Sequence, residues 1–169
     1  MEGQNKLSCI EGIEIGLLNG QKALIFPKYS EEKLLESDQI TKWDARKLSE
    51  MESLKVEDTI SETAALFLLN SPAAEWVFRF STRYGRQFSL PSLLAAMEIQ
   101  HQEEEIDALA ETIEGADLLR DFTSGVWSCS RYNAGFGWIA YGGIGYAYYS
   151  SLRTAYLAVP TILYREEEL

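Results

Sequence analysis

The feature that most constrains this chain is a C-terminal third that is almost free of charge. Between Phe122 and Tyr164 the only charged residues are Arg131 and Arg153. The segment is rich in glycine, and its aromatic residues after Phe122 are Trp127, Tyr132, Phe136, Trp138, Tyr141, Tyr146, Tyr148, Tyr149, Tyr156 and Tyr164. Such a composition disfavours helix and favours β-structure. A folded domain built on this segment therefore needs a sheet there.

Two strand predictions follow within this segment. Residues 138–141 and 144–149 flank Gly142-Gly143, which predicts a β-hairpin. Residues 155–164 predict one closing strand, with Pro160 at an edge or a bulge, since proline donates no hydrogen bond to a ladder.

The N-terminal part predicts a second hairpin. Ile13, Ile15 and Leu17 alternate, and Asn19-Gly20 separates them from the apolar residues 23–26. Asn-Gly between two apolar runs is a strong hairpin signal. Pro27 is predicted to end the second strand. We expect the strands near the two ends of the sequence to pair, which would bury the N-terminal residues against Leu157, Val159 and Ile162.

The middle of the chain has helical patterns. Ser30 opens a short charged segment at residues 30–35 that predicts either a short helix or a loop. Further helices are predicted from Thr41, which precedes an apolar face containing Leu48 and Met51, and from Thr59 or Ser61. Another begins after Ser71 with Pro72 in its first turn and ends near Gly85. The last two begin at residues 92 and 103, and Gly115 is predicted to stop the second of them.

Helices in the middle and antiparallel strands at both ends predict an α+β fold. The 169 residues are enough for one domain with its own core. We find no internal repeat and no low-complexity linker, so residues 1–169 are predicted to form a single domain.

Four short motifs occur in a recognisable order. They are Leu90-Pro91-Ser92, Trp127-Ser128-Cys129-Ser130, Gly137-Trp138 and Val159-Pro160. This order resembles a C-type-lectin-like family of gut-bacterial and phage proteins. That family has a Leu-Pro-Ser or Leu-Pro-Thr helix start, a Trp-Ser-Ser-Ser segment, an Ala-Trp strand and a final Val-Arg-Pro-Val strand. The resemblance implies a C-type-lectin-like fold.

The resemblance covers residues 86–164, and Trp43-Asp44-Ala45 is similar to the family's first-helix motif. Residues 52–85 are longer than the family pattern, and we expect them to be a helical insertion. Cys129 stands where the family has serine, and Val159 stands where it has arginine before the final proline. Glycine, alanine and tyrosine replace the family's asparagine-rich loops.

The acidity of the chain excludes some partners. Its formal net charge is −11, and no basic stripe is present. Such a chain repels phosphate backbones, so nucleic acid is not an expected partner. No apolar run approaches the length that spans a bilayer, so membrane insertion is not expected. The N-terminus lacks a signal-peptide pattern, which favours a cytoplasmic or phage-assembled protein.

Catalysis and metal chemistry have little support in the sequence. His101 is the only histidine, which rules out a two-histidine metal site within one chain. Glu103 and Asp107 fit a helix start better than an acid–base pair. Cys9 and Cys129 are expected to be buried thiols, with a single bridge between them as the alternative. The absence of Asp and Glu from residues 122–164 argues against a lectin-type calcium site.

The aromatic segment is therefore the candidate functional region. We expect a non-catalytic, calcium-independent recognition domain without a cofactor, whose ligand is a protein or a glycan. The expected binding residues are Arg131, Tyr132, Asn133, Tyr146, Tyr148 and Arg153. Two alternatives remain open: an assembly component of a phage or surface appendage, which would form homo-oligomers through the aromatic face, and an enzyme on a lectin-like scaffold.

Overall fold

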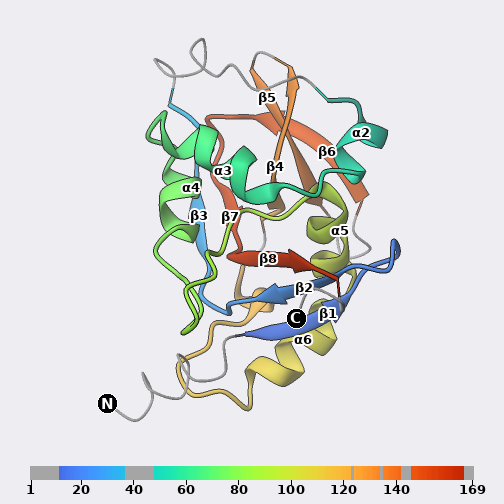
Figure 1. Ribbon diagram of the computed structural model, residues 1–169, viewed down its shortest axis with the longest axis vertical. Helices are drawn as coiled ribbons and strands as arrows, with labels where there is room; N and C mark the ends of the chain where they lie inside the picture. Colours follow the sequence, from blue (N-terminus) through green and yellow to red (C-terminus); the bar gives the residue numbers. More distant parts are fainter. Residues whose placement is uncertain (1–11, 37–47, 123, 134, 142–145, 166–169) are drawn as a thin grey trace.

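The computed structural model describes residues 12–36, 48–122, 124–133, 135–141 and 146–165 (Figure 1). These residues form an α+β fold with two sheets. The three-stranded sheet has the order β1-β2-β8, and the five-stranded sheet has the order β3-β7-β4-β5-β6. In Figure 1 the smaller sheet lies below the larger one.

The three-stranded sheet joins the two ends of the described chain. Strands β1 (Ile13–Gly16) and β2 (Lys22–Ile25) form the predicted hairpin, and β2 pairs antiparallel with β8 (Thr161–Tyr164). Gly20 lies in the hairpin turn with a φ of 85°, a conformation that glycine adopts without steric cost. Both the hairpin and the pairing of N-terminal with C-terminal strands are confirmed.

The five-stranded sheet contains most of the aromatic segment. Its strands β4 (Val126–Asn133), β5 (Phe136–Tyr141) and β6 (Tyr146–Ser151) form an antiparallel meander. The predicted hairpin of residues 138–149 is β5–β6, whose connection at residues 142–145 lies outside the described residues. Strand β7 (Tyr156–Ala158) pairs with β4 in parallel and with β3 (Ser30–Glu32) antiparallel.

Five α-helices and one short 3-10 helix fill the middle of the described chain. The elements are α2 (Glu50–Leu54), α3 (Thr59–Phe67), α4 (Pro72–Val77), α5 (Leu93–His101), α6 (Glu103–Ala110) and η2 (Leu119–Asp121). Ser71 and Ser92 cap α4 and α5 by accepting a hydrogen bond from the backbone N–H three residues on. The predicted helix from Thr41 falls mostly on residues 37–47, which lie outside the described residues.

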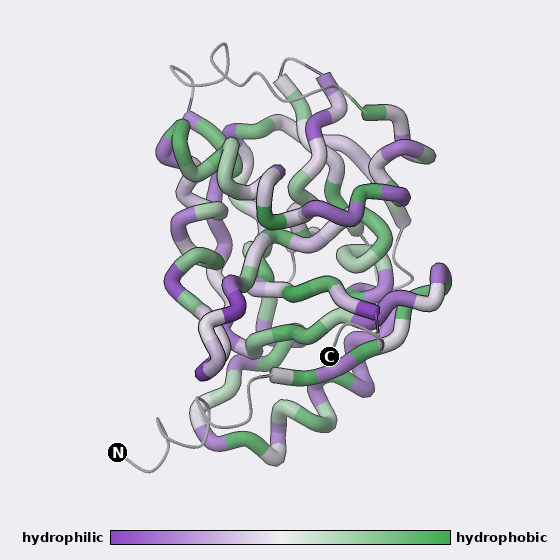
Figure 2. The backbone as a smooth tube through the Cα atoms, in the orientation of Figure 1, coloured by the Kyte–Doolittle hydropathy of each residue, from purple (hydrophilic) through white to green (hydrophobic). Residues whose placement is uncertain are grey.

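The first half of β4 and the middle of β5 are buried on both faces of the larger sheet, and their side chains alternate between the two faces. Val126 and Ala140 are cross-strand partners and pack in the cluster that contains Ile99 of α5. Trp127 and Ile139 point the other way, into a cluster with α3 and α4. We call these the α5 face and the α3/α4 face. In Figure 2, hydrophobic residues lie along β2 and β8 in the middle of the molecule.

Gly137 explains how the α3/α4 face accommodates Trp127. A Cβ at this position would come within 3.1 Å of both the Trp127 ring and Leu152, and within 3.2 Å of Leu34. Those atoms belong to fully buried side chains, which have no space to retreat. The glycine therefore fits the close packing of this core.

The prediction of a single closing strand over residues 155–164 is wrong. Residues 155–164 form two strands, β7 in the larger sheet and β8 in the smaller one. Pro160 lies between them, and its carbonyl accepts a hydrogen bond from the Phe26 N–H at 3.0 Å. Because proline has no N–H, the ladder cannot continue through it, and the chain crosses between sheets there.

Three further predictions need correction. Residues 30–32 form β3 rather than a helix or loop, because their backbone pairs with the distant β7. Helix α4 ends at Val77, well before Gly85, and the Gln87 amide donates hydrogen bonds to the carbonyls of Phe78 and Phe80 beyond it. Helix α6 ends at Ala110, ahead of Gly115.

The expected burial of the N-terminal hairpin holds except at one position. Ile13, Ile15 and Leu17 share a core cluster with Leu157 and Val159. The other expected partner, Ile162, instead packs in a separate cluster with Phe26, Phe88 and Tyr164. Alternation along β8 explains this, since Ile162 points to the opposite side from its neighbour Leu163, which packs against the first cluster.

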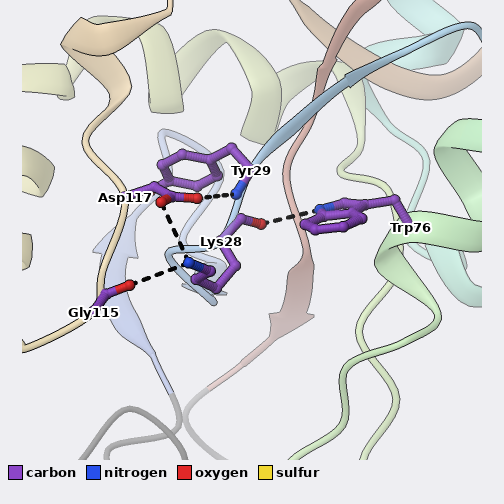
Figure 3. A network of polar contacts seen from close by, with 5 residues as sticks. All are labelled: Lys28, Tyr29, Trp76, Gly115 and Asp117. Carbon is purple, nitrogen blue, oxygen red and sulfur yellow. Dashed lines mark hydrogen bonds and ion pairs between the residues drawn. The ribbon is translucent and has the colours of Figure 1, made fainter. Parts of the chain in front are cut away.

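A polar junction fixes the segment between the two sheets (Figure 3). The Asp117 carboxylate accepts the Tyr29 N–H at 2.9 Å and lies 3.4 Å from the Lys28 ammonium. The same ammonium donates to the Gly115 carbonyl at 3.2 Å, and the Trp76 indole N–H donates to the Lys28 carbonyl at 3.1 Å. This junction ties the loop after α6 and helix α4 to the chain between β2 and β3.

Candidate binding surface

The exposed aromatic side chains of the larger sheet gather on β5 and β6. Their exposed fractions are 39% for Phe136, 54% for Tyr141, 65% for Tyr146, 62% for Tyr148 and 41% for Tyr149. Exposed aromatic residues on neighbouring strands are unusual, since large apolar rings are normally buried. We call these five residues the aromatic edge, because β6 is the last strand of the sheet in the described part of the chain.

Buried tryptophans anchor the strands beneath the aromatic edge. The Trp138 indole N–H donates to the Leu48 carbonyl at 2.9 Å, and the Leu48 N–H donates to the Arg131 carbonyl at 3.0 Å. The Trp127 indole N–H donates to the Glu32 carbonyl at 2.8 Å. Satisfied indole donors fix ring orientation in a core. Both tryptophans are buried.

A ring stack connects β4 to β6. The Tyr132 and Tyr149 rings lie 4.0 Å apart between centroids with planes 7° apart, and the Tyr148 ring lies 5.5 Å from the Tyr149 ring at 11°. Trp138 meets both Tyr132 and Tyr149 edge-on. Such contacts contribute roughly 0.5–1.5 kcal/mol per pair beyond the buried area. The stack therefore holds exposed rings in defined positions.

The structure brings only part of the predicted site together. Tyr132 and Tyr148 join through Tyr149, and the Arg131 Nε–H donates to the Asn133 carbonyl at 2.8 Å. The Asn133 side-chain oxygen accepts the Gly135 N–H at 3.0 Å and so shapes the β4–β5 turn.

The other predicted residues lie outside this stack. Tyr146 is the cross-strand partner of Tyr141, and both point to the α3/α4 face. Arg153 is exposed in the turn after β6, where its N–H donates to the Ser151 hydroxyl at 3.3 Å. Tyr156 is half-buried, meets the Trp127 ring edge-on at 5.1 Å and shares a hydrogen bond with Ser150.

The sequence reasoning missed three residues of the surface: Phe136, Tyr141 and Tyr149. Tyr149 points to the α5 face with its cross-strand partner Trp138. It stays 41% exposed because no further strand follows β6 in the described residues. Its membership in the aromatic run was a usable signal, but the position of β6 at the sheet edge was not visible locally.

Three described residues carry side chains that are often catalytic: Cys129, Asp107 and His101. Cys129 is a buried free thiol, and burial raises its pKa, which disfavours the reactive thiolate. The Asp107 carboxylate accepts the N–H groups of Leu119 at 2.7 Å and Arg120 at 3.0 Å, which fixes η2 on α6. His101 is exposed at the end of α5. Cys9 lies outside the described residues.

An acidic hollow lies beside α6. Its lining includes Glu103, Asp107, Glu111 and Arg120. Burial, together with neighbouring carboxylates, raises the pKa of Glu103. Among the described residues no group of three histidine, cysteine or carboxylate side chains is placed to hold a metal ion. Within the same residues, none of the helices is long and apolar enough to cross a membrane.

Comparison with known proteins returned no relative. No family model, no curated protein and no solved structure matches this chain.

Proposed function

We propose that this chain is a C-type-lectin-like recognition domain that binds a protein or glycan ligand at its aromatic edge, without catalysis and without calcium. The observation that carries the proposal is the exposure of Tyr146 and Tyr148, at 65% and 62%, on a strand whose neighbour β5 contains the anchored Trp138. Rings needed only for packing would be buried. These rings are open to a ligand.

The placement of the motifs supports the lectin-like part of the proposal. Ser92 of the Leu-Pro-Ser motif caps α5, and Trp127 lies on β4. Trp138 lies on β5, and Pro160 stands between β7 and β8. The pairing of β2 with β8 closes the domain near both ends of the described chain. Helices between paired terminal strands agree with what the resemblance implies.

The chemistry of the edge suits a neutral or weakly polar ligand. Tyrosine presents a large ring and a hydroxyl at a small cost in side-chain entropy, which is why binding surfaces are rich in it. The pyranose face of a sugar or an apolar protein side chain can stack on Tyr146 or Tyr148. Arg153 and the amide of Asn133 lie at the two turns that flank the edge strands and would add polar specificity.

A glycan panel with calcium and with chelator tests this proposal. We expect a rise in the melting temperature with one sugar class, equal in calcium and in chelator. The rise should disappear in the Tyr146→Ala/Tyr148→Ala double variant and persist in a Tyr84→Ala control, which removes a still more exposed tyrosine from the loop after α4. A shift that survives the double variant would refute the aromatic edge as the site.

A protein ligand requires a separate assay. If no sugar shifts the melting temperature, the double variant and the Tyr84→Ala control are compared for binding to candidate surface proteins. Loss confined to the double variant supports recognition at the aromatic edge. Equal binding by both variants contradicts it.

A further inference from the structure

Basic residues are unevenly distributed along this acidic chain, and three arginines cluster in the segment that follows α4. Arg79, Arg83 and Arg86 are all exposed, and we call residues 79–87 the arginine loop. Residues 76–97 contain no aspartate and no glutamate, so the arginines have no carboxylate close to them in sequence. Because the whole chain has a formal net charge of −11, the loop is a local positive region on an acidic molecule.

Backbone hydrogen bonds shape the arginine loop into a small β-hairpin. Ser81 and Gln87 form an antiparallel bridge, and the Thr82 N–H donates to the Arg86 carbonyl at 2.8 Å. The Gly85 N–H donates to the Thr82 carbonyl at 2.9 Å, and Gly85 has a φ of 87°. A turn that ends with glycine in the left-handed region is typical of hairpin loops of this length. In Figure 1 the hairpin extends below α4, on the other side of the molecule from β6.

Side-chain hydrogen bonds hold the arginine loop to the body of the domain. The Gln87 amide donates to the Phe80 carbonyl at 2.7 Å and to the Phe88 carbonyl at 3.0 Å. The Arg86 N–H donates to the hydroxyl of the buried Thr82 at 3.1 Å. A loop that is already fixed by its own bonds loses little conformational entropy on binding. The arginine loop is therefore pre-organised to present its side chains.

Two of the arginines lie against aromatic rings. The Arg79 guanidinium carbon is 5.0 Å from the centre of the Trp76 ring, and that of Arg83 is 5.1 Å from the centre of the Tyr84 ring. The Trp76 ring is itself held by its hydrogen bond to the Lys28 carbonyl (Figure 3). A ring contact keeps the charge of the guanidinium, whose planar fork of N–H donors matches the two oxygens of a carboxylate. The rings thus support positive groups that suit an anionic ligand.

We propose that the arginine loop binds a short carboxylate-rich segment of a partner protein. Charge complementarity selects this ligand, since three arginines lie in a part of the chain without acidic residues. A long polyanion such as nucleic acid would extend from the loop onto the rest of the surface, where carboxylates outnumber basic groups and repel it. A short acidic peptide can stay within the loop. This interaction does not depend on what the aromatic edge binds.

Fluorescence anisotropy with labelled hexaglutamate as the probe tests the inference. At about 0.1 M salt, charges more than about 10 Å apart are largely screened, so the measurement reports local contacts. We expect saturable binding by the wild type and an affinity about fivefold or more lower in Arg83→Gln/Arg86→Gln. The matched control is Lys33→Gln/Lys55→Gln, which removes the same charge from two other exposed positions and should bind as the wild type does. Equal losses in both double variants, or no binding by the wild type, would overturn the inference.

Two single variants separate charge from folding and from ring contacts. Arg83→Gln leaves the hairpin bonds of Thr82 in place and should already weaken binding by about twofold or more. Tyr84→Ala keeps all three arginines and should bind hexaglutamate nearly as the wild type does, because exposed ring contacts are weak. Unchanged binding in Arg83→Gln contradicts the proposed site.

Two further probes test the class of ligand. Hexaglutamine has the same length without carboxylates and should not bind, and equal binding of the two peptides would contradict a role for the arginine charges. A single-stranded oligothymidine of about twenty nucleotides should bind more weakly than hexaglutamate, because the acidic surface repels its phosphates. Tighter binding of the oligonucleotide would assign the arginine loop to nucleic acid and overturn the proposal of a protein ligand.

Discussion

The polar junction and the aromatic edge use opposite means to hold side chains in place. At the junction, Asp117 and Lys28 are fixed by directional bonds to backbone and to each other. At the aromatic edge, Tyr148 and Tyr149 are placed by ring contacts with each other and with Tyr132 of β4, and most of the Tyr148 side chain remains exposed. From this difference we infer that the polar junction contributes mainly to stability, whereas the aromatic edge keeps surface available for contact.

The interior tryptophan beneath both regions should show the largest effect on stability. Trp127 is fully buried, donates to the Glu32 carbonyl and packs against Tyr156. We expect Trp127→Ala to lower the free energy of unfolding by about 3–5 kcal/mol, because it leaves a cavity in a packed core. Urea denaturation followed by circular dichroism measures this. A loss below 1 kcal/mol would mean that the α3/α4 face is loosely packed.

The junction should show the next largest effect. Asp117→Ala leaves the Tyr29 N–H without its acceptor and removes the ion pair with Lys28. We expect a loss of about 1–2 kcal/mol, mostly from the unsatisfied N–H. The matched control is Asp121→Ala, which alters a carboxylate nearby on η2 and should change the unfolding free energy by less than about 0.5 kcal/mol. Equal losses of unfolding free energy in both variants would contradict a specific contribution of the junction to stability.

Tyr29 gives the junction a pH dependence at alkaline pH. Its hydroxyl is buried and has no partner among the described residues, and burial raises its pKa above the ordinary value of 10.0. The folded state therefore favours the neutral phenol, so stability is present below pH 10 and is lost as pH rises beyond it. We expect Tyr29→Phe to be neutral or stabilising by about 1 kcal/mol at pH 7.

The same variant should weaken the alkaline loss of stability. Denaturant midpoints are compared between pH 8 and pH 11 for wild type, Tyr29→Phe and the exposed control Tyr84→Phe. A smaller alkaline loss only in Tyr29→Phe supports the buried phenol. Identical curves for all three proteins would show that Tyr29 ionises freely in the fold.

The smallest effect is expected in the three-stranded sheet. Tyr164 donates a hydrogen bond to Glu14, and this bond, ahead of Lys22, holds the pKa of Glu14 below its usual range. A lowered pKa adds stability at neutral pH that is lost as pH falls through the folded pKa. Because Glu14 is half exposed, we expect Tyr164→Phe to cost under about 0.5 kcal/mol at pH 7. The difference between the two proteins should shrink as pH falls through the folded pKa of Glu14, and a difference that does not change with pH would assign the loss to packing.

The sequence predicts the local elements of this fold better than their long-range partners. The Asn19-Gly20 hairpin and the Ser71 and Ser92 caps depend on neighbouring residues, and all three are confirmed. By contrast, β3 forms only because Ser30 meets Ala158, a partner far along the chain. The break at Pro160 between the sheets likewise follows from tertiary pairing and not from the local pattern.

The sequence also predicts only those residues of the candidate site whose exposure follows from local alternation. The aromatic run identifies Tyr146 and Tyr148 as exposed, because they alternate with residues of the opposite face. It does not place Tyr149 in the surface, since that requires the knowledge that β6 ends the sheet. Nor does it separate Tyr156 from the exposed tyrosines, because the contact with Trp127 crosses strands that are not adjacent in sequence.

The most direct test measures stability and binding on the same protein. For the Tyr146→Ala/Tyr148→Ala double variant, the account predicts a free energy of unfolding within about 1 kcal/mol of wild type, since both side chains are exposed. It also predicts at least a tenfold loss of affinity for whichever glycan or protein the screens identify. A double variant that unfolds, or one that binds as wild type does, would contradict the claim that the aromatic edge is a binding surface.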